Sequence, residues 1–328
     1  MTNEIETVMR RYDGRVPGAS LLVIRNDEPV IRRSWGCADI ENGVLATSRT
    51  NYRLASVSKQ FTAAAVLLLA EDGRVSLGDR LSEFFPSLAP SLDAVTIHHL
   101  LTHASGLIDY EELIPPETTT QLCSADVLQL LEGQKTGYFA PGSGYRYSNS
   151  GYALLALIVE RVSGGTFADF LARRVFGPLG MNDTVAHEEG ISTVGNRAFG
   201  YTMTNGEWAR KDQSLTSAVL GDGGIYSSID DLAKWDAAWY DGRLLSDESR
   251  RVALIGHTAT DDPSVSYGFG WRITGETFWH SGETSGFRNV IVRYPARRLT
   301  IVLLTNRDDP EPYETALVIA KINLDSAG

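Results

Sequence analysis

The chain has 328 residues, enough for one large domain or for two that share an interface. Its hydrophobic content of 43% and charged content of 22% are ordinary for a folded protein and argue against a disordered chain. The net charge of -11 argues against partners that need a basic surface, such as nucleic acid or an anionic membrane, and leaves small neutral or cationic substrates open.

The first predicted elements are a helix and a β-hairpin. Residues 1–11 have the pattern of an amphipathic helix and lack the apolar core of a signal peptide. Residues 18–25 and 29–36 have the composition of strands, with a turn at 26–28 between them. No apolar run approaches the length of a membrane span, so we expect a cytoplasmic protein with no membrane partner.

Ser56 and Lys59 stand at the start of a helix predicted over residues 57–71. Residues three apart lie on one helix face, so the Ser56 hydroxyl and the Lys59 amine can come within hydrogen-bonding distance. The residues after Lys59 are almost all apolar, which indicates a buried helix. A desolvated amine can lose its proton near neutral pH and serve as the base that activates a serine. The plainer interpretation is that Ser56 caps the helix and that Lys59 is solvated.

From residue 72 to about residue 235, short helices alternate with loops that contain many glycines and prolines. A longer helix is predicted over residues 151–162, and few strands are expected in this part. Tyr147 and Asn149 precede that helix and form the only Tyr-x-Asn pattern in the chain. The plainer interpretation of Tyr147 is a packing residue.

The end of the chain returns to β-structure. Predicted strands cover residues 266–274, 277–280, 287–294 and 299–305, and a final helix covers 312–324. Strands at both chain ends with helices between them predict one α/β domain built from residues 1–75 and 250–328. Residues 76–249 would form a mainly helical domain, with the active site at the interface. His280, on one of these strands, would ordinarily be a partly buried, hydrogen-bonded histidine.

These segments together carry the motif set of one family. The motifs are Ser56-x-x-Lys59, Tyr147-x-Asn149, and His280-Ser281-Gly282 in the place of a Lys-Thr-Gly. The chain resembles the penicillin-recognising serine hydrolases, in the group of class C β-lactamases, D-alanyl-D-alanine peptidases, D-aminopeptidases and esterases of that fold. Residues 100–107, 141–152 and 223–232 also look like family segments in the expected order. The resemblance implies an α/β fold of the α+β type, β-lactamase/transpeptidase-like, with an antiparallel sheet flanked by helices and a helical insertion.

The resemblance also implies roles for individual residues. Ser56 would be the acylated nucleophile, Lys59 its proton partner and Tyr147 a second general base. Because a tyrosine titrates near 10, Tyr147 could act only if Lys59 and another donor stabilise its oxyanion or share its proton. Asn149 would hold the Lys59 amine and the amide carbonyl of the substrate. The backbone N–H groups of Ser56 and Glu283 would form the oxyanion hole.

One position departs from the family pattern. His280 stands where β-lactamases of this group carry lysine, and a histidine titrates near 6.5 and is mostly neutral at pH 7. A histidine at position 280 would therefore not offer a substrate carboxylate the permanent positive charge that lysine offers. Ser281 and Gly282 follow His280 on the same predicted strand. Glu283 would add negative charge beside the oxyanion position, which repels a carboxylate and attracts an amine.

We therefore expect a serine hydrolase that needs no cofactor and forms an acyl-enzyme with a carboxylic ester or a small amide. The alternatives are a β-lactamase or D-alanyl-D-alanine carboxypeptidase, with a β-lactam or peptide as the small-molecule partner, and a non-catalytic binding protein of the same fold. No metal is expected, because His99 and His103 lie four residues apart without a third ligand nearby. Cys37 and Cys123 are expected to be unpaired, as isolated thiols usually are in cytosolic proteins. The sequence indicates no oligomeric state.

Overall fold

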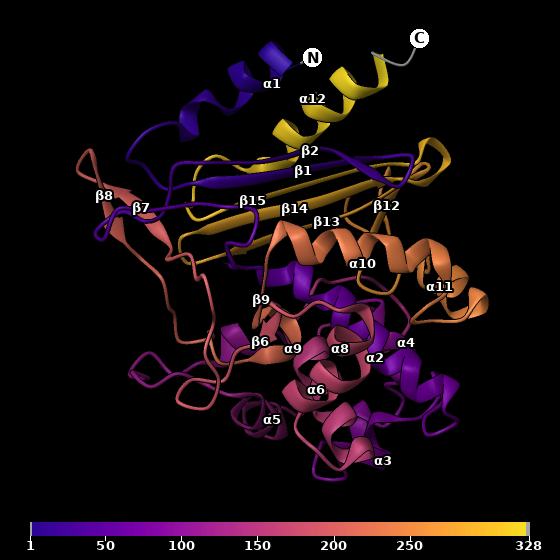
Figure 1. Cartoon of the computed structure of the whole chain (residues 1–328). Coiled ribbons are helices and arrows are strands. Elements are labelled where there is room, and N and C mark those ends of the chain that lie inside the picture. Colours follow the sequence, from indigo (N-terminus) through magenta and orange to yellow (C-terminus); the bar gives the residue numbers. More distant parts are fainter. Residues whose placement is uncertain (1, 326–328) are drawn as a thin grey trace.

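The computed structural model describes residues 2–325 and is built around an eight-stranded antiparallel sheet (Figure 1). In order across the sheet, the strands are β10 (Thr258–Ala259), β11 (Ser266–Tyr267), β12 (Arg272–Thr274), β13 (Thr277–Thr284), β14 (Phe287–Tyr294), β15 (Leu299–Thr305), β1 (Ala19–Arg25) and β2 (Glu28–Trp35). β1 pairs with β15, so that Leu21 lies opposite Leu303 and the two ends of the chain form one sheet. The predicted antiparallel sheet built from both termini is confirmed.

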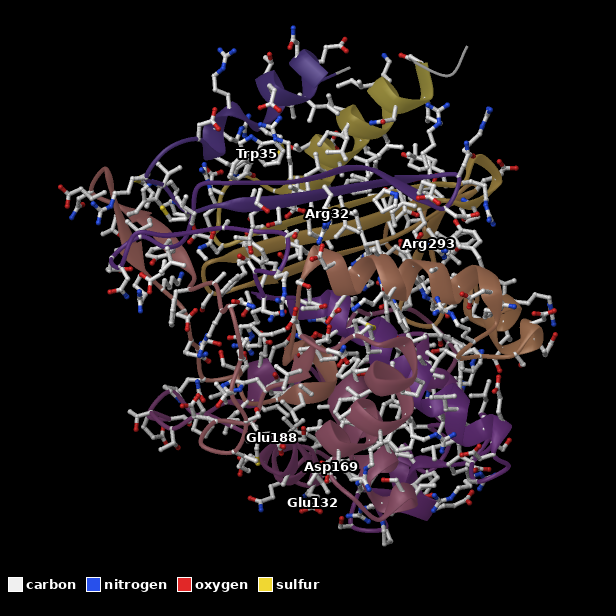
Figure 2. All side chains as sticks on the ribbon, in the orientation of Figure 1. Arg32, Trp35, Glu132, Asp169, Glu188 and Arg293 are labelled. Carbon is white, nitrogen blue, oxygen red and sulfur yellow. The ribbon has the colours of Figure 1, made fainter. Side chains whose placement is uncertain are left out.

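One face of the sheet is covered by the first and last helices, α1 (Thr2–Met9) and α12 (Pro312–Asp325) (Figure 1). Successive residues of a strand point to opposite faces. Accordingly, Leu21 and Val23 of β1 pack in the core beneath these helices, whereas Leu22 and Ile24 belong to the core on the other side. Trp35 belongs to the core beneath α1 and α12, and Figure 2 shows it on the side of α1.

The opposite face packs on α10 (Ile229–Asp241), and α2 (Lys59–Glu71) lies beyond it (Figure 1). Arg293 of β14 points toward α10 (Figure 2) and donates from Nε to Asp236 Oδ1 at 2.6 Å, with both side chains buried. Thr300 donates a second hydrogen bond to the same carboxylate oxygen at 2.9 Å. This buried pair joins the sheet to α10, and the loss of one partner would leave an uncompensated charge inside the protein.

The rest of the structure is mainly helical. Its remaining α-helices are α3 (Leu81–Phe84), α4 (Ile97–Leu101), α5 (Ser124–Glu132), α6 (Asn149–Ser163), α7 (Phe167–Leu171), α8 (Gly177–Leu179), α9 (Leu220–Gly223) and α11 (Asp247–Ala253). Single turns of other helix types are η1 (Arg10–Tyr12), η2 (Ala55–Ser58), η3 (Pro90–Leu92), η4 (Tyr110–Leu113), η5 (Ala172–Phe176) and η6 (Pro295–Arg297). Leu22 of β1, Phe61 of α2 and Leu154 of α6 share one continuous core. The boundaries of the two predicted domains stay a prediction.

Several short strands lie outside the large sheet. They form the pair β3 (Cys37–Asp39) with β4 (Val44–Leu45), the sheet β5 (Tyr52–Arg53), β9 (Ile225–Ser227), β6 (Val185–Ala186), and the hairpin β7 (Tyr201–Thr204) with β8 (Glu207–Arg210). Four of them, β6 to β9, fall in the middle segment, where few strands were expected. The hairpin turns at Asn205 and Gly206, both with positive φ, which is the commonest signal for a two-residue hairpin turn. The two- and three-residue strands are too short to show an alternating pattern. Within residues 2–325, no helix combines the length and apolar character needed to cross a membrane.

The predicted strand over residues 266–274 is interrupted. Gly268 separates β11 from the segment that leads to β12, and Gly270 has a φ of +75°. A β-carbon on Gly270 would lie 2.8 Å from the carbonyl oxygen of Lys59. The break in the strand therefore lets its backbone approach the beginning of α2, where the predicted site lies.

Candidate active site

Ser56 lies on the turn η2, between strand β5 and helix α2. The preceding residue, Ala55, has a φ of +50°, a conformation that costs energy for a residue with a side chain. The turn is held by a close neighbour, because a β-carbon on Gly282 of β13 would lie 2.0 Å from the carbonyl oxygen of Leu54. Ser56 is thus presented to the cleft by a strained and tightly packed turn.

The Lys59 side chain is fully buried, and its amine has three oxygen neighbours. Nζ lies 3.0 Å from Ser56 Oγ, 2.8 Å from Asn149 Oδ1 and 2.9 Å from the carbonyl oxygen of Asp222. The amide and main-chain oxygens can only accept hydrogen bonds, whereas the serine hydroxyl can also donate. A neutral amine would give its two N–H bonds to those acceptors and point its lone pair at Ser56. The predicted contact between Ser56 and Lys59 is confirmed.

Asn149 is the first residue of α6, and three contacts fix its orientation. Its backbone N–H donates to Asp109 Oδ2 at 2.7 Å, and its side-chain Nδ2 donates to Glu111 Oε1 at 3.0 Å. Its Oδ1 accepts from Lys59, so the amide has its oxygen toward the lysine and its nitrogen toward the carboxylate. The position expected for Asn149 beside the Lys59 amine is confirmed.

Tyr147 contacts Lys59 through its ring. Nζ of Lys59 lies 4.9 Å from the Tyr147 ring centroid, and the His103 ring lies 4.2 Å away at a tilt of 34°. Among the described residues, the Tyr147 hydroxyl has no hydrogen-bond partner. The structure therefore brings Tyr147 to the site, but without the hydrogen bond to Lys59 that a shared proton would need.

His280 is buried, and the expectation that it titrates near 6.5 is wrong. Its side chain is 1% exposed, its Nδ1–H donates to the carbonyl of Ser281 at 2.6 Å, and the hydroxyl of Tyr267 donates to Nε2 at 2.9 Å. Burial holds the pKa of His280 well below its usual value, and the positive charges of Arg272 and Lys59 lower it further. The imidazole is therefore neutral, and its ring centroid lies 6.2 Å from that of Tyr147.

A cleft of about 720 Å³ opens in front of Ser56. Its lining consists of Ser56, Glu111, Ile114, Tyr147, Asn149, Lys211, Ser214, Leu215, Thr216, Glu283, Thr284, Ser285, Gly286, Arg288 and Asp308. Ser56 and Glu283 both line it, and the oxyanion hole expected from their N–H groups stays a prediction. Of the other strand residues expected at the substrate, His280, Ser281 and Gly282 are not among the residues that line this cleft.

Glu283 itself is an exposed side chain at the edge of the cleft. Its carboxylate pairs with Nη2 of Arg288 at 2.6 Å, and the same guanidinium donates to the carbonyls of Thr284 and Phe287. The negative charge that the sequence placed beside the oxyanion position is therefore largely offset by a neighbouring cation.

Two acidic residues near Lys59 were missed by the sequence analysis. The carbonyl of Asp222 accepts from Lys59, and burial raises the pKa of its carboxyl to about 7 against the opposing charge of Lys59. Glu111 lines the cleft, and partial burial raises the pKa of its carboxyl, with a further rise from Asp109. A main-chain acceptor leaves no trace in a sequence motif, and Glu111 belongs to none of the three motifs found in the sequence.

The histidines considered for metal binding are engaged in local hydrogen bonds. Nδ1 of His99 accepts from the N–H of Thr96, and Nδ1 of His103 accepts from the N–H of Ser148. No cluster of three or more possible ligands occurs in the described part of the chain. The two cysteines are unpaired, with Cys37 buried and Cys123 exposed.

With this geometry established, the comparisons with known proteins identify the family. Residues 3–323 match the family described as Beta-lactamase, and the chain belongs to it. The chain is 30% identical over 320 residues to "Penicillin-binding protein 4*" of Bacillus subtilis strain 168, covering 92% of this chain and 70% of that protein. The predicted family and its serine hydrolase class are confirmed.

Two further proteins show how widely the similarity extends. A D-aminopeptidase of Cereibacter sphaeroides (strain ATCC 17029) is 29% identical over 338 residues, which cover 94% of this chain but only 61% of that enzyme. The crystal structure of a penicillin binding protein from Bacillus halodurans matches with a TM-score of 0.84 at 28% identity, covering 99% of this chain and 100% of that one. The fold is therefore the one that the resemblance implied.

Proposed function

We propose that this chain hydrolyses small esters and amides through an acyl-enzyme on Ser56. The observation that carries the proposal is the position of the buried Lys59 amine, 3.0 Å from the Oγ of Ser56, which lines an open cleft. A serine needs a base within hydrogen-bonding distance to become a nucleophile, and Lys59 is the one basic side chain that its hydroxyl contacts among the described residues.

In the first step, Lys59 takes the proton of the Ser56 hydroxyl as Oγ forms a bond to the carbonyl carbon of the substrate. The electrons of the C=O bond move to its oxygen, and the N–H groups of Ser56 and Glu283 stabilise this negative charge. Asn149 keeps the lysine directed at the serine through its 2.8 Å hydrogen bond. When the tetrahedral intermediate collapses, the bond to the alcohol or amine breaks and that group takes up the proton.

In the second step, water attacks the ester carbon of acylated Ser56. One proton of the water passes to a basic group at the site, the bond between the carbon and Oγ breaks, and Oγ recovers a proton. The side chains that can take part are Lys59 and the Tyr147 hydroxyl, which is free of hydrogen-bond partners within residues 2–325. We assign to Lys59 both the removal and the return of the Ser56 proton, because the Tyr147 hydroxyl makes no hydrogen bond to Lys59 through which a proton could pass.

The charges of the cleft favour substrates with a free amine. Of the three carboxylates that line the cleft, Glu283 is paired with Arg288, which leaves Glu111 and Asp308 to attract an amine. The neutral His280 offers no cation at the position where lysine is usual. One carboxylate oxygen of Glu111 accepts a hydrogen bond from Asn149, and Glu111 lines the same cleft as Ser56. We therefore infer a preference for esters and amides of amino acids whose amine is free, a chemistry consistent with the name of the D-aminopeptidase relative.

A β-lactam or a peptide with a free carboxylate is the second candidate substrate. The observation that favours it is the presence of two cations, Lys211 and Arg288, in the lining of the cleft. Arg288 is already paired with Glu283, which leaves Lys211 as the more available partner for a carboxylate. Acylation of Ser56 by nitrocefin, compared with acylation by amino acid p-nitroanilides, decides between the two substrate classes.

The test of the proposal is covalent labelling of Ser56. A fluorophosphonate probe or a short p-nitrophenyl ester is expected to add its acyl or phosphonyl group to Ser56 in the wild type and not in Ser56→Ala. Ser214→Ala is a matched control, because Ser214 lines the same cleft but its hydroxyl lies against Thr216 and Ser217. Equal labelling of Ser56→Ala and wild type would contradict the proposal, and absence of labelling would favour a binding protein without turnover.

A further inference from the structure

The main chain of Asp222 accepts a hydrogen bond from the buried Lys59, and the charge of this lysine favours ionisation of the Asp222 carboxyl group. Its carbonyl oxygen accepts from Lys59 Nζ at 2.9 Å, and its side-chain Oδ2 accepts from the hydroxyl of Tyr110 at 2.9 Å. The residue is 6% exposed. A buried carboxyl group is costly, so its position at the residue that holds the buried Lys59 amine requires an explanation.

The turn that carries Asp222 is locked in place from two sides. The carbonyl of Gly221 accepts from the Thr62 hydroxyl at 2.6 Å, and a β-carbon on Gly221 would lie 2.2 Å from the carbonyl oxygen of Tyr152. Helices α2 and α6 therefore fix the backbone of α9. The carbonyl of Asp222 is thereby held beside Lys59, and its carboxyl group is held separately by the hydroxyl of Tyr110.

Neighbouring groups both favour and oppose ionisation of the Asp222 carboxyl group. Lys59 of α2 favours its ionised form, as does the hydroxyl donated by Tyr110, whereas Glu111 and Asp109 from the same loop oppose ionisation. Burial is the largest influence and raises the pKa of Asp222 to about 7. The group therefore gains or loses its charge in the pH range in which a serine hydrolase works.

We propose that Asp222 is a positioning residue that controls how readily Lys59 gives up its proton. When Asp222 is ionised, its negative charge holds the proton on the lysine, and when it is neutral the lysine releases the proton more easily. This inference rests on the proposed function, in which unprotonated Lys59 activates Ser56. In this role Asp222 acts through Lys59 and exchanges no atoms with the substrate.

The informative variant is Asp222→Asn, which removes the charge and keeps both the main-chain carbonyl and an oxygen for Tyr110. Lys59 would then lose its proton at lower pH. The acidic limb of the pH profile, where the rate of Ser56 acylation falls because Lys59 is protonated, is therefore expected to move about one pH unit lower. Tyr110→Phe removes the donor that favours the ionised carboxyl, so a smaller shift in the same direction is expected. An acidic limb that stays in place in both variants overturns the proposal, and so does a shift to higher pH.

Asp231→Asn is the matched control for this experiment. Asp231 is also a buried carboxylate, but it pairs with Lys234 at 2.7 Å and accepts from Thr184, away from the described contacts of Lys59. Its loss is expected to leave the acidic limb where it is in the wild type. A shift as large as that of Asp222→Asn would show that any buried carboxylate has this effect and would overturn the specific role.

A second measurement does not depend on turnover. The chain has five lysines, so Lys59 labelled with ¹³C at Cε can be followed by NMR in a Ser56→Ala background and assigned by its loss in Lys59→Gln. The Lys59 signal is expected to titrate about one pH unit lower when Asp222→Asn is added. An unchanged or higher midpoint overturns the proposal. If the wild type proves inactive while this shift is present, the proposed function fails and the inference about Asp222 stands.

Discussion

Gly282 of strand β13 lies so close to Leu54 that a β-carbon at position 282 would be 2.0 Å from the Leu54 carbonyl oxygen. This contact places the strand directly against the turn that carries Ser56. It explains physically why a glycine stands two residues after His280, since any side chain there would push the strand away from the nucleophile.

The first prediction follows from this contact. Gly282→Ala is expected to displace β13 from the Ser56 turn and to lower the rate of Ser56 acylation about 100-fold, because small misplacements of reacting groups have effects of this size. Gly195→Ala is the control, since a β-carbon there meets open space. Burst kinetics with a p-nitrophenyl ester measure both variants. Equal acylation rates in Gly282→Ala and wild type would show that the contact does not matter.

The second prediction concerns Asn149. Asn149→Ala removes the hydrogen bond to the Lys59 amine, and hydrogen bonds to charged groups contribute about 1.5–3 kcal/mol. We expect a loss of roughly 10- to 150-fold in kcat/KM, with the protein still folded, because the other contacts of α6 remain. The measurement is kcat/KM for one amino acid ester, with thermal unfolding as the control for folding. A loss below threefold would mean that Asn149 does not direct the lysine.

The third prediction is a pH dependence of stability that arises from His280. Burial lowers the folded-state pKa of His280, so below about pH 6.5 the unfolded chain binds a proton that the folded chain does not. Its contribution to stability is therefore present above pH 6.5 and is lost as the pH falls, at up to about 1.4 kcal/mol per pH unit. Burial also lowers the pKa of His103 and that of His98, the latter to about 4, so the total slope includes more than one histidine.

Denaturant unfolding between pH 5 and pH 7 measures this slope. His280→Gln is expected to reduce it by about one proton, because glutamine does not titrate. The same variant is expected to leave the acidic limb of Ser56 acylation unchanged, since His280 is neutral in the folded protein. A steeper slope in His280→Gln than in the wild type would contradict the buried, neutral imidazole.

The fourth prediction concerns the buried pair of Arg293 and Asp236 between the sheet and α10. Arg293→Met leaves the Asp236 carboxylate inside the protein without a cation and is expected to lower the free energy of unfolding by about 3–5 kcal/mol. Adding Asp236→Leu removes the unpaired charge and is expected to restore most of the loss. The test is to measure the free energy of unfolding by denaturant for the wild type, the single variant and the double variant. A double variant less stable than Arg293→Met would contradict this account.

Much of the fold could be predicted from long, regular segments. The predicted strands over residues 287–294 and 299–305 have the same bounds as β14 and β15, and the final helix differs by one residue at its end. Long apolar runs with clear turns at both ends leave little choice of structure. The β7–β8 hairpin was missed even though Asn205 and Gly206 form a recognisable turn signal, because its strands have only four residues each.

The candidate site could be predicted where side chains alone define it. The residues Ser56, Lys59, Tyr147 and Asn149 come together as their motifs indicated. The state of His280 could not be predicted, because it depends on Tyr267 of β11 and on Arg272 of β12, which the sheet brings beside it. The role of the Asp222 carbonyl could not be predicted either, since every residue has a carbonyl group.

The central claim is that Lys59 activates Ser56 to form an acyl-enzyme. The most direct measurement is intact-protein mass spectrometry after rapid mixing with a p-nitrophenyl ester, for wild type, Ser56→Ala and Lys59→Gln. We predict one added acyl group on the wild type, located at Ser56 by peptide mapping, none on Ser56→Ala, and formation at least about 1,000-fold slower on Lys59→Gln. Acylation of Lys59→Gln at the wild-type rate, or an acyl group on a residue other than Ser56, would contradict the claim.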